Sequence, residues 1–343
     1  MTERIVLALD GGQSGTLAVV GTTSGRILGV GAGGPIRHHD EPDAERVAAD
    51  SVASALDAAY GEAGLDAAAE ACCLSMTGSS GIVEAVVAER VHPGRIDVLA
   101  SDAVAALAAG TGRAVGVVVI AGTGSVAYAA SADGSATDRG GWGWFMGDEG
   151  SGFWIAAQAL RSAALGFDGV GPVTELSELL PAALGFDTLR EVYNAVTGGA
   201  VDRARIAALA RPVLDLAGTG DPVAGRIVAE AAEALERLVL GTVSAAPWLA
   251  DDERSVVFGG GVLSPASPVA DALASRLAHS LPDFTVIHSD LPPAAGAYFL
   301  ALRSCGVDVD AAMLASVRDQ FRSRSIQAGK NAPHHDNPVT KES

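Results

Sequence analysis

The chain has 343 residues, of which 49% are hydrophobic, so it can bury a substantial core, and its length suggests two domains. Its formal net charge of −18 argues against nucleic acid as a partner, because a phosphate backbone needs a basic surface. Its three cysteines, two of them adjacent, fit neither a disulfide framework nor CxxC metal spacing, which favours a reducing cytoplasm.

The first third of the chain alternates short apolar strands with glycine turns and helices. Asp10 ends the first apolar run before a signal-peptide core or a membrane span could form. Strands are predicted at residues 4–9, 16–20, 27–30, 71–75, 96–100 and 115–120, and a helix at 44–60. This alternation indicates an α/β sheet.

Near residue 115 the pattern restarts. A strand at 117–120, a glycine turn at 121–125 and a strand at 126–130 repeat the arrangement of residues 5–20. Further elements are predicted in the order helix 222–243, strand 255–258, turn 259–261, helix 269–279, strand 284–287 and helices 292–302 and 311–321.

The repeat predicts a division of the chain into two α/β domains. These are an N-terminal domain at 1–114 and a second domain at 115–291, with closing helices at 292–326 that return to the first domain. The remainder, 327–343, lacks periodicity and is expected to be a disordered tail. The pair His334-His335 lies there and is given no metal role.

Three glycine turns follow apolar strands, at residues 10–16, 121–125 and 259–261. Such turns can bring backbone N–H groups to phosphate oxygens without side-chain obstruction. None matches GxxxxGK[ST] or a dinucleotide-binding GxGxxG unit. Taken singly, each is equally compatible with a plain hairpin turn.

The segment 141–152, GWGWFMGDEGSG, combines glycines, two indoles and two carboxylates. It fits the wall of a polar small-molecule site, because indoles stack on sugar rings and carboxylates accept hydrogen bonds from hydroxyl or ammonium groups. The alternative is a glycine turn in which Asp148 caps a helix at 153–165 and the indoles are buried.

With these motifs the chain resembles the actin-like and sugar-kinase ATPases, and within them the N-acetylglucosamine kinase-like branch that includes the BadF/BadG-type ATPases. Residues 10–16 resemble the first phosphate loop, 120–125 the second, and 258–262 the adenosine motif, while 141–151 is similar to the sugar-binding block. The resemblance covers residues 4–303 and implies two ribonuclease H-like domains with ATP and sugar in the cleft between them.

The resemblance implies an ATP and Mg²⁺ site. The residues it assigns to ATP are Gly11, Gly12, Gln13, Ser14, Gly15, Thr16, Gly122, Thr123, Gly124, Gly260 and Gly261. Asp10 would hold Mg²⁺ directly or through water, since this cation prefers oxygen ligands. A turn-capping aspartate is the alternative role for Asp10.

Asp102 is the candidate general base. It follows the strand 96–100 and opens an alanine-rich helix, which puts a carboxylate where α/β clefts bind ligands. Phosphoryl transfer needs a carboxylate to accept the hydroxyl proton, and in similar kinases the base occupies this place. The alternative is a plain helix N-cap.

The expected sugar site combines several loops. Besides Asp102, the resemblance implies Thr77 and Gly78 in a first-domain loop, Gly141, Trp142 and Asp148 in the tryptophan segment, and His38 near the amino-sugar substituent. Relatives commonly use Asn at that last position. A flexible Ser/Gly connection at 77–81 and a surface histidine without a role are the alternatives.

The predicted function is ATP-dependent phosphorylation of an amino sugar at its 6-hydroxyl by a cytoplasmic monomer or homodimer without a membrane partner. Glucosamine is preferred because its ammonium group suits Asp148, Glu149 and the acidic surface, and because the chain resembles actinobacterial glucosamine kinases. The alternatives are an N-acetylglucosamine kinase, a non-catalytic sensor, or a BadF-type ATPase that activates a partner enzyme through an iron–sulfur cluster, for which Cys72 and Cys73 are poorly placed.

Overall fold

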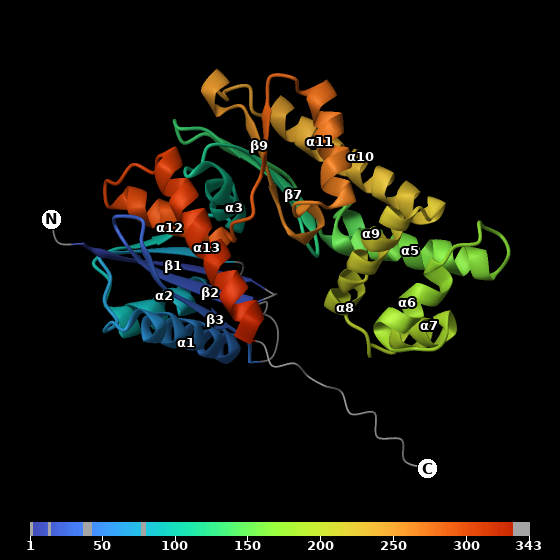
Figure 1. Ribbon diagram of the computed structural model, residues 1–343, viewed down its shortest axis with the longest axis horizontal. Coiled ribbons are helices and arrows are strands. Elements are labelled where there is room, and N and C mark those ends of the chain that lie inside the picture. The colour runs from blue at the N-terminus through green and yellow to red at the C-terminus, as the bar shows by residue number, and fades with distance from the viewer. Residues whose placement is uncertain (1–2, 13–14, 37–42, 77–79, 332–343) are drawn as a thin grey trace, which may run out of the picture.

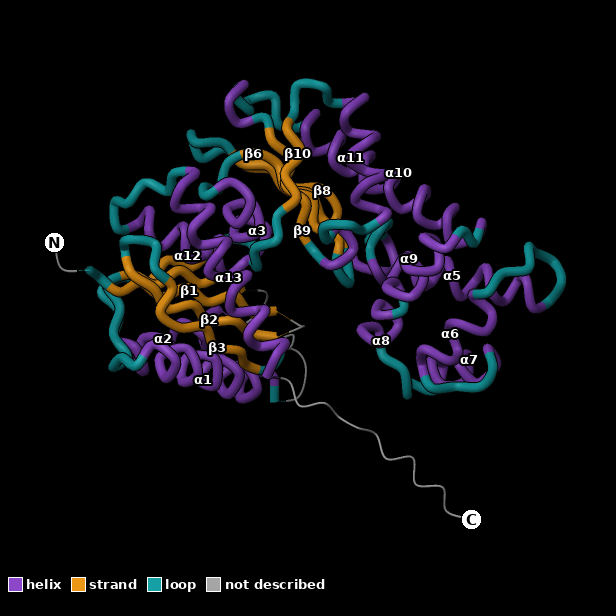
Figure 2. The backbone as a smooth tube through the Cα atoms, in the orientation of Figure 1, coloured by secondary structure: helices purple, strands orange, loops and turns teal. Residues whose placement is uncertain are grey.

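The computed structural model describes residues 3–12, 15–36, 43–76 and 80–331, and these form two five-stranded mixed sheets (Figures 1 and 2). The first has the order β3 (Ile27–Gly33), β2 (Gly15–Thr22), β1 (Ile5–Gly12), β4 (Ala71–Met76), β5 (Ile96–Val98). The second has the order β8 (Ala136–Gly140), β7 (Ser125–Ala130), β6 (Gly116–Ala121), β9 (Ser255–Gly259), β10 (Thr285–His288).

The two sheets share one topology. In each, the central strand pairs antiparallel with the next strand in the chain and parallel with a strand that follows a helical crossover. The expected repeat is therefore confirmed and extends to all five strands, with two α/β units of the ribonuclease H-like kind. The strand β8 completes the second sheet but has no apolar alternation, so the sequence pattern missed it.

Glycines set the distance between the first sheet and helix α1 (Ala44–Ala63). A Cβ on Gly29, Gly31 or Gly33 would overlap backbone atoms of α1. These three positions alternate along β3 and so share one face of the strand. The helix can therefore lie directly on this strand, and its Val52 and Leu56 are buried against the sheet.

Helix α3 (Asp102–Thr111) lies between the two sheets (Figure 1). Ala105 and Ala109 pack in the core of the first unit, whereas Leu107 packs on Val257 of the second sheet. Small side chains let one helix contact layers on both sides. Consequently the residue at the start of α3 lies at the junction of the two units.

Two helices that follow the second sheet in the chain pack on the first sheet, namely α12 (Pro293–Ser304) and α13 (Ala311–Asn331). The Tyr298 hydroxyl of α12 donates a 2.7 Å hydrogen bond to the Thr22 carbonyl. Helix α13 continues to Asn331, beyond the expected helix end at residue 321. The expectation of a disordered tail at 327–343 stays a prediction, and 332–343 lie outside the described residues.

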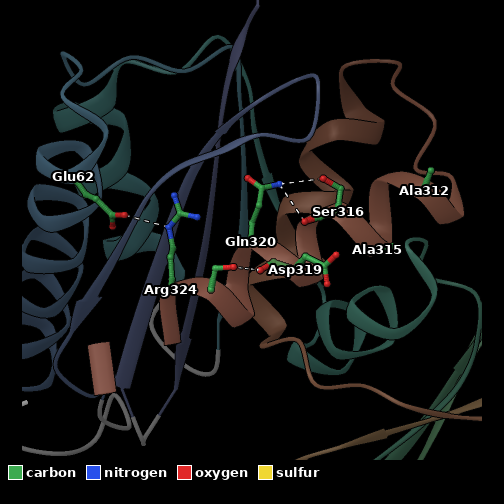
Figure 3. A pocket seen from close by; sticks show the side chains of 8 residues that line it. Glu62, Ala312, Ala315, Ser316, Asp319, Gln320 and Arg324 are labelled. Atoms are coloured by element: carbon green, nitrogen blue, oxygen red, sulfur yellow. Dashed lines mark hydrogen bonds and ion pairs between the residues drawn. The ribbon is translucent and has the colours of Figure 1, made fainter. Parts of the chain in front are cut away.

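Side chains of α1 and α13 hydrogen-bond to the free edge of β3. Figure 3 shows two of these side chains, Glu62 of α1 and Arg324 of α13, paired with each other. The Ile27 N–H donates to Gln320 Oε1 at 2.8 Å, and the Val30 N–H donates to Glu62 Oε2 at 2.9 Å. Arg324 donates to the Ile27 carbonyl and pairs with Glu62. Covering an edge strand in this way protects it from pairing with another chain.

The second unit carries a larger helical layer. It comprises α4 (Gly143–Met146), α5 (Gly152–Phe167), α6 (Leu176–Leu184), α7 (Leu189–Thr197), α8 (Arg203–Ala208), α9 (Ala210–Thr219), α10 (Pro222–Ser244), α11 (Pro268–Ser280) and the 3₁₀ turns η1 (Asp251–Glu253) and η2 (Gly261–Leu263). In the first unit, α2 (Ser80–Val91) follows β4. Among the described residues, no helix is both long and apolar enough to cross a bilayer.

Candidate active site

A cavity of about 220 Å³ lies where the ends of β1, β6 and β9 meet the start of α3. Its lining draws on both sheets and on the connection from β10 to α12. The lining residues are Asp10, Gly11, Gly12, Asp102, Ala106, Ile120, Phe258, Gly259, Gly260, Ser289, Leu291 and Pro293. Two carboxylates and the glycines at the ends of β1 and β9 thus share one space.

Asp102 is the first residue of α3 and faces this cavity. Its neighbour Ser101 caps the helix, because the Ser101 hydroxyl accepts a hydrogen bond from the Ala103 N–H at 3.2 Å. The alternative interpretation of Asp102 as a plain N-cap is therefore wrong. The Ser101 hydroxyl also donates a 3.3 Å hydrogen bond to Asp102 Oδ1, which leaves the other carboxylate oxygen of Asp102 for the cavity.

Asp10 lies near the end of β1, and its carboxylate accepts a 2.8 Å hydrogen bond from the Ser75 hydroxyl. Burial raises the pKa of Asp10 to about 6. The Ser75 hydroxyl opposes this rise in the pKa, whereas the negative charge of Asp102 adds to it. An ionised Asp10 is therefore costly without a cation nearby.

This setting fits a divalent cation. Asp10 offers a largely buried carboxylate oxygen beside a second carboxylate, and hard cations such as Mg²⁺ prefer such donors. In nucleotide sites Mg²⁺ takes one or two protein carboxylates and completes its shell with phosphate oxygens and water. Asp10 is the residue that would supply the protein ligand here.

A second cavity, of about 610 Å³, lies between the turn after β6 and helices α8 and α9. Its lining residues are Gly122, Thr123, Gly152, Arg203, Ala204, Ala207, Ala208, Ala210, Arg211, Leu214, Gly261 and Val262. Gly260 has φ +85°, and a Cβ there would overlap the Ala121 carbonyl. Only glycine lets η2 approach the turn this closely.

The residues expected to bind ATP separate into two groups. Gly11, Gly12 and Gly260 line the first cavity, whereas Gly122, Thr123 and Gly261 line the second. The glycine turns from both sheets thus border the two cavities. Binding of ATP by these six residues stays a prediction.

Three others among the expected ATP residues line neither cavity. The Thr16 hydroxyl is buried and donates to the Gly34 carbonyl at 2.9 Å, which ties β2 to the segment after β3. Gly15 pairs with Gly12 in the β1–β2 ladder. A Cβ on Gly124 would lie 2.9 Å from the Asp148 carboxylate, so this glycine serves a packing contact.

The two indoles of the tryptophan segment are exposed. Trp142 is 69% exposed and Trp144 is 55% exposed, so the alternative of buried core indoles is wrong. Trp144 packs against Phe153 with ring centroids 5.7 Å apart. Gly141, with φ +71°, and Trp142 line neither of the two cavities, and their contact with a sugar stays a prediction.

Asp148 is 5% exposed, and both of its carboxylate oxygens have protein partners. Oδ2 lies 2.6 Å from Arg203 Nη2, and Oδ1 accepts a 3.1 Å hydrogen bond from the Ser125 N–H. The cap of α5 is Ser151, which accepts from the Trp154 N–H, so the alternative of Asp148 as helix cap is wrong. Asp148 was expected to accept hydrogen bonds from a sugar, but in the structure its carboxylate is ion-paired with Arg203.

Five of the expected site residues lie outside the described residues, namely Gln13, Ser14, His38, Thr77 and Gly78. Conversely, sequence reasoning missed Arg203, Arg211 and the connection 289–293, which line the two cavities. The connection had a usable signal, because Pro292-Pro293 marks the start of a helix after a strand. Arg203 had none, since its local sequence is that of an ordinary surface helix.

Residues 7–301 match the BadF/BadG/BcrA/BcrD ATPase family. An N-acetylmuramic acid/N-acetylglucosamine kinase of Clostridium acetobutylicum is 29% identical over 314 residues, which are 88% of this chain and 99% of that protein. An N-acetyl-D-glucosamine kinase of Dictyostelium discoideum is 30% identical over 209 residues, 60% of this chain and 65% of that protein.

Solved structures share the fold. A Chromobacterium violaceum protein described as an N-acetylglucosamine kinase superposes with a TM-score of 0.67 at 27% identity, covering 87% of this chain and 99% of that one. A ROK family glucokinase from Streptomyces griseus superposes with a TM-score of 0.54 at 19% identity, covering 87% and 98%. The second likeness concerns the fold alone.

Proposed function

The chain belongs to the BadF/BadG/BcrA/BcrD ATPase family, and from this premise we propose that it is an ATP-dependent kinase acting on the 6-hydroxyl of an amino sugar. The observation that carries the proposal is the shared cavity of Asp10 and Asp102, bordered by glycine-bearing strand ends of both sheets. The kinase names of the relatives support the same reaction class.

Asp102 acts as the general base. As the 6-oxygen attacks the γ-phosphorus, its proton passes to the Asp102 carboxylate, and the bond to the β,γ-bridging oxygen breaks to release ADP. Because Ser101 performs the capping and engages only Oδ1 of Asp102, the second carboxylate oxygen at the start of α3 has this role. The protein otherwise contributes position and charge stabilisation.

Asp10 would hold Mg²⁺, which would supply positive charge against the phosphate oxygens during phosphoryl transfer. On the protein side, Ser75 fixes the Asp10 carboxylate by a 2.8 Å hydrogen bond. The second cavity, between the turn 121–125 and α8–α9, would hold the rest of the nucleotide.

N-acetylglucosamine is the first substrate to expect, ahead of glucosamine. The sequence argument for glucosamine relied on Asp148, Glu149, the acidic surface and the resemblance to glucosamine kinases, but Arg203 neutralises the Asp148 carboxylate. The names of both curated relatives include N-acetylglucosamine. Glucosamine stays the second candidate because the chain has a net charge of −18 and an exposed Glu149, which favour a cationic sugar.

A coupled assay of ADP formation tests the proposal. We expect sugar-dependent turnover with N-acetylglucosamine and a lower kcat/KM with glucosamine and glucose, each measured against a reaction without sugar. A higher kcat/KM on glucosamine would reverse the order of the two substrates. Equal ADP formation with and without every sugar would contradict a sugar kinase.

The cysteines do not favour the alternative of a cluster-bearing activator. Cys72 and Cys73 are buried in β4, and burial raises the pKa of both thiols to about 12. Thiols held in the protonated form are poor ligands for an iron–sulfur cluster. Reduced, unpaired cysteines also agree with the cytoplasmic location that we propose.

A further inference from the structure

Arg203 is a cation in the lining of the cavity of about 610 Å³ between the turn 121–125 and helices α8 and α9. It is the first residue of α8 and lines the cavity together with Gly122 and Thr123. Its Nη2 lies 2.6 Å from Asp148 Oδ2, and its guanidinium lies 5.7 Å above the Phe153 ring. Two contacts from different segments thus fix the orientation of this side chain.

The same contacts place Arg203 at the end of the cavity next to the turn 121–125. Asp148, its partner, accepts a hydrogen bond from the Ser125 N–H at 3.1 Å. The Ser125 hydroxyl in turn donates to the Glu149 carbonyl at 2.9 Å. The guanidinium, the carboxylate and the turn are therefore one connected unit.

Arg203 keeps donors for an anion. Asp148 engages Nη2, whereas a guanidinium has five N–H donors. The side chain of Arg203 is 35% exposed. Its Nε is buried and has no hydrogen-bond partner among the described residues, so the donors for an anion are the N–H groups of the two Nη atoms that Asp148 leaves open. A planar guanidinium with free donors matches the oxygens of a phosphate group.

Arg211, the other cation on this cavity's described lining, is placed differently. It is 81% exposed and pairs with Asp215 one turn along its own helix, at 3.1 Å. Such an exposed pair contributes little and leaves the side chain mobile. Arg203 is therefore the better candidate for a fixed contact with an anionic ligand.

We propose that Arg203 contacts a phosphate group of the nucleotide in this cavity, and that Asp148 is the positioning residue that holds it. The inference relies on the proposed function only for the presence of a nucleotide and makes no use of the sugar. The proposal also gives a role to the buried carboxylate of the tryptophan segment. Asp148 would orient Arg203 and the Ser125 amide toward the nucleotide.

Binding titrations with adenosine and with ADP·Mg test this contact. We expect Arg203→Met to weaken ADP·Mg binding by about tenfold or more, because a charge-assisted hydrogen bond is lost, and to change adenosine binding less than about twofold. Arg226→Met removes an exposed arginine of α10 that lines neither cavity, so it is the control and should change neither affinity by more than about twofold. Unchanged ADP·Mg binding in Arg203→Met, or an equal loss of adenosine binding, would overturn the proposal.

Arg203→Met leaves Asp148 buried without its partner, so a second variant separates binding from folding. In Asp148→Asn/Arg203→Met the amide oxygen can still accept from the Ser125 N–H, and no charge is left unpaired. We expect this double variant to recover thermal stability while ADP·Mg affinity stays low. If affinity returns with stability, the ion pair is only structural and the phosphate contact is refuted.

This test and the test of the kinase activity can fail independently. If Arg203 governs ADP·Mg affinity but no amino sugar is phosphorylated, the proposed reaction alone is wrong. If amino sugars are phosphorylated and Arg203→Met binds ADP·Mg normally, only the role of Arg203 is wrong.

Discussion

Asp10 and Asp102 line one cavity from two different elements; burial raises the pKa of Asp10 to about 6, and the charge of Asp102 adds to this rise. Two carboxylates that face one space repel each other unless a cation lies between them or one carries a proton. Holding the Asp10 and Asp102 carboxylates together therefore costs free energy at neutral pH, and a bound Mg²⁺ would reduce that cost. A functional site commonly carries such a cost.

Asp10→Asn should make the protein more stable at pH 8 while abolishing phosphorylation. The pKa of Asp10 is about 6 in the folded chain, above its ordinary 3.8, so ionised Asp10 lowers the free energy of unfolding above pH 6. The gain has an upper limit of about 3 kcal/mol at pH 8, begins to shrink below pH 6 and is nearly lost as the pH approaches 3.8. Urea unfolding at pH 8 and at about pH 4 measures it.

Magnesium provides the control for Asp10. Added Mg²⁺ should stabilise the wild type at pH 8 and leave Asp10→Asn unchanged, because the substituted amide is a weaker ligand. A stability gain that is equal at both pH values would contradict the assignment of the raised pKa to Asp10.

Asp102→Asn should lower kcat by a factor of about 10² to 10⁴, the usual contribution of general-base catalysis. ADP·Mg binding should be retained within a few-fold, since Ser101 rather than Asp102 caps α3. Ser101→Ala, at the neighbouring residue, is the control. It should lower the free energy of unfolding by about 1 kcal/mol and affect kcat far less than Asp102→Asn. An Asp102→Asn enzyme with near-normal turnover would assign the base to another residue.

The two carboxylates of the cavity, Asp10 and Asp102, were predictable from the sequence, because local sequence patterns mark their positions. Asp10 and Asp102 each follow an apolar strand, and strand ends of one sheet converge by geometry. The Asp148–Arg203 pair was not predictable, because 55 positions separate the two residues and their contact depends on how α8 packs. Exposure of Trp142 likewise depends on packing that no local pattern encodes.

The same distinction applies to the fold. The repeat of strand, glycine turn and strand predicted two related units, because short continuous apolar runs bounded by turns are typical of buried strands. Strand β8 is exposed along most of its length, so it lacks that pattern and forms only because β7 offers a paired edge. The end of α13 was missed because its polar sequence gives little apolar periodicity, although residues earlier in the helix hold it against β3.

Gly296→Ala should destabilise the protein by about 1–3 kcal/mol, the usual cost of overpacking. A Cβ on Gly296 would overlap the backbone of α3 at the Ala105 carbonyl, so α12 must move away from α3. Gly225→Ala, in α10, is the control, because no atom lies within 4 Å of its added Cβ. It should instead stabilise by about 0.5–1 kcal/mol through helix propensity. Equal effects of the two substitutions in urea unfolding would contradict the close contact of α12 and α3.

We expect Asp290 to hold the connection from β10 to α12 in place by pairing with two arginines of α13. Its carboxylate lies 3.0 Å from Arg318 and 2.6 Å from Arg322, both on α13. The flanking Ser289 and Leu291 line the cavity of Asp10 and Asp102, so loss of this clamp would move one wall of the cavity.

We therefore expect Asp290→Asn to lower kcat/KM by about tenfold, because small misplacements of a site are costly, and Asp290→Glu to restore part of it. Asp308→Asn is the matched control, since it removes a pairing between Asp308 and Arg303 that is exposed on both sides. That change should alter neither kcat/KM nor stability beyond about 0.5 kcal/mol. If Asp290→Asn reduced thermal stability while kcat/KM stayed unchanged, α13 would only brace the fold and would have no influence on the cavity.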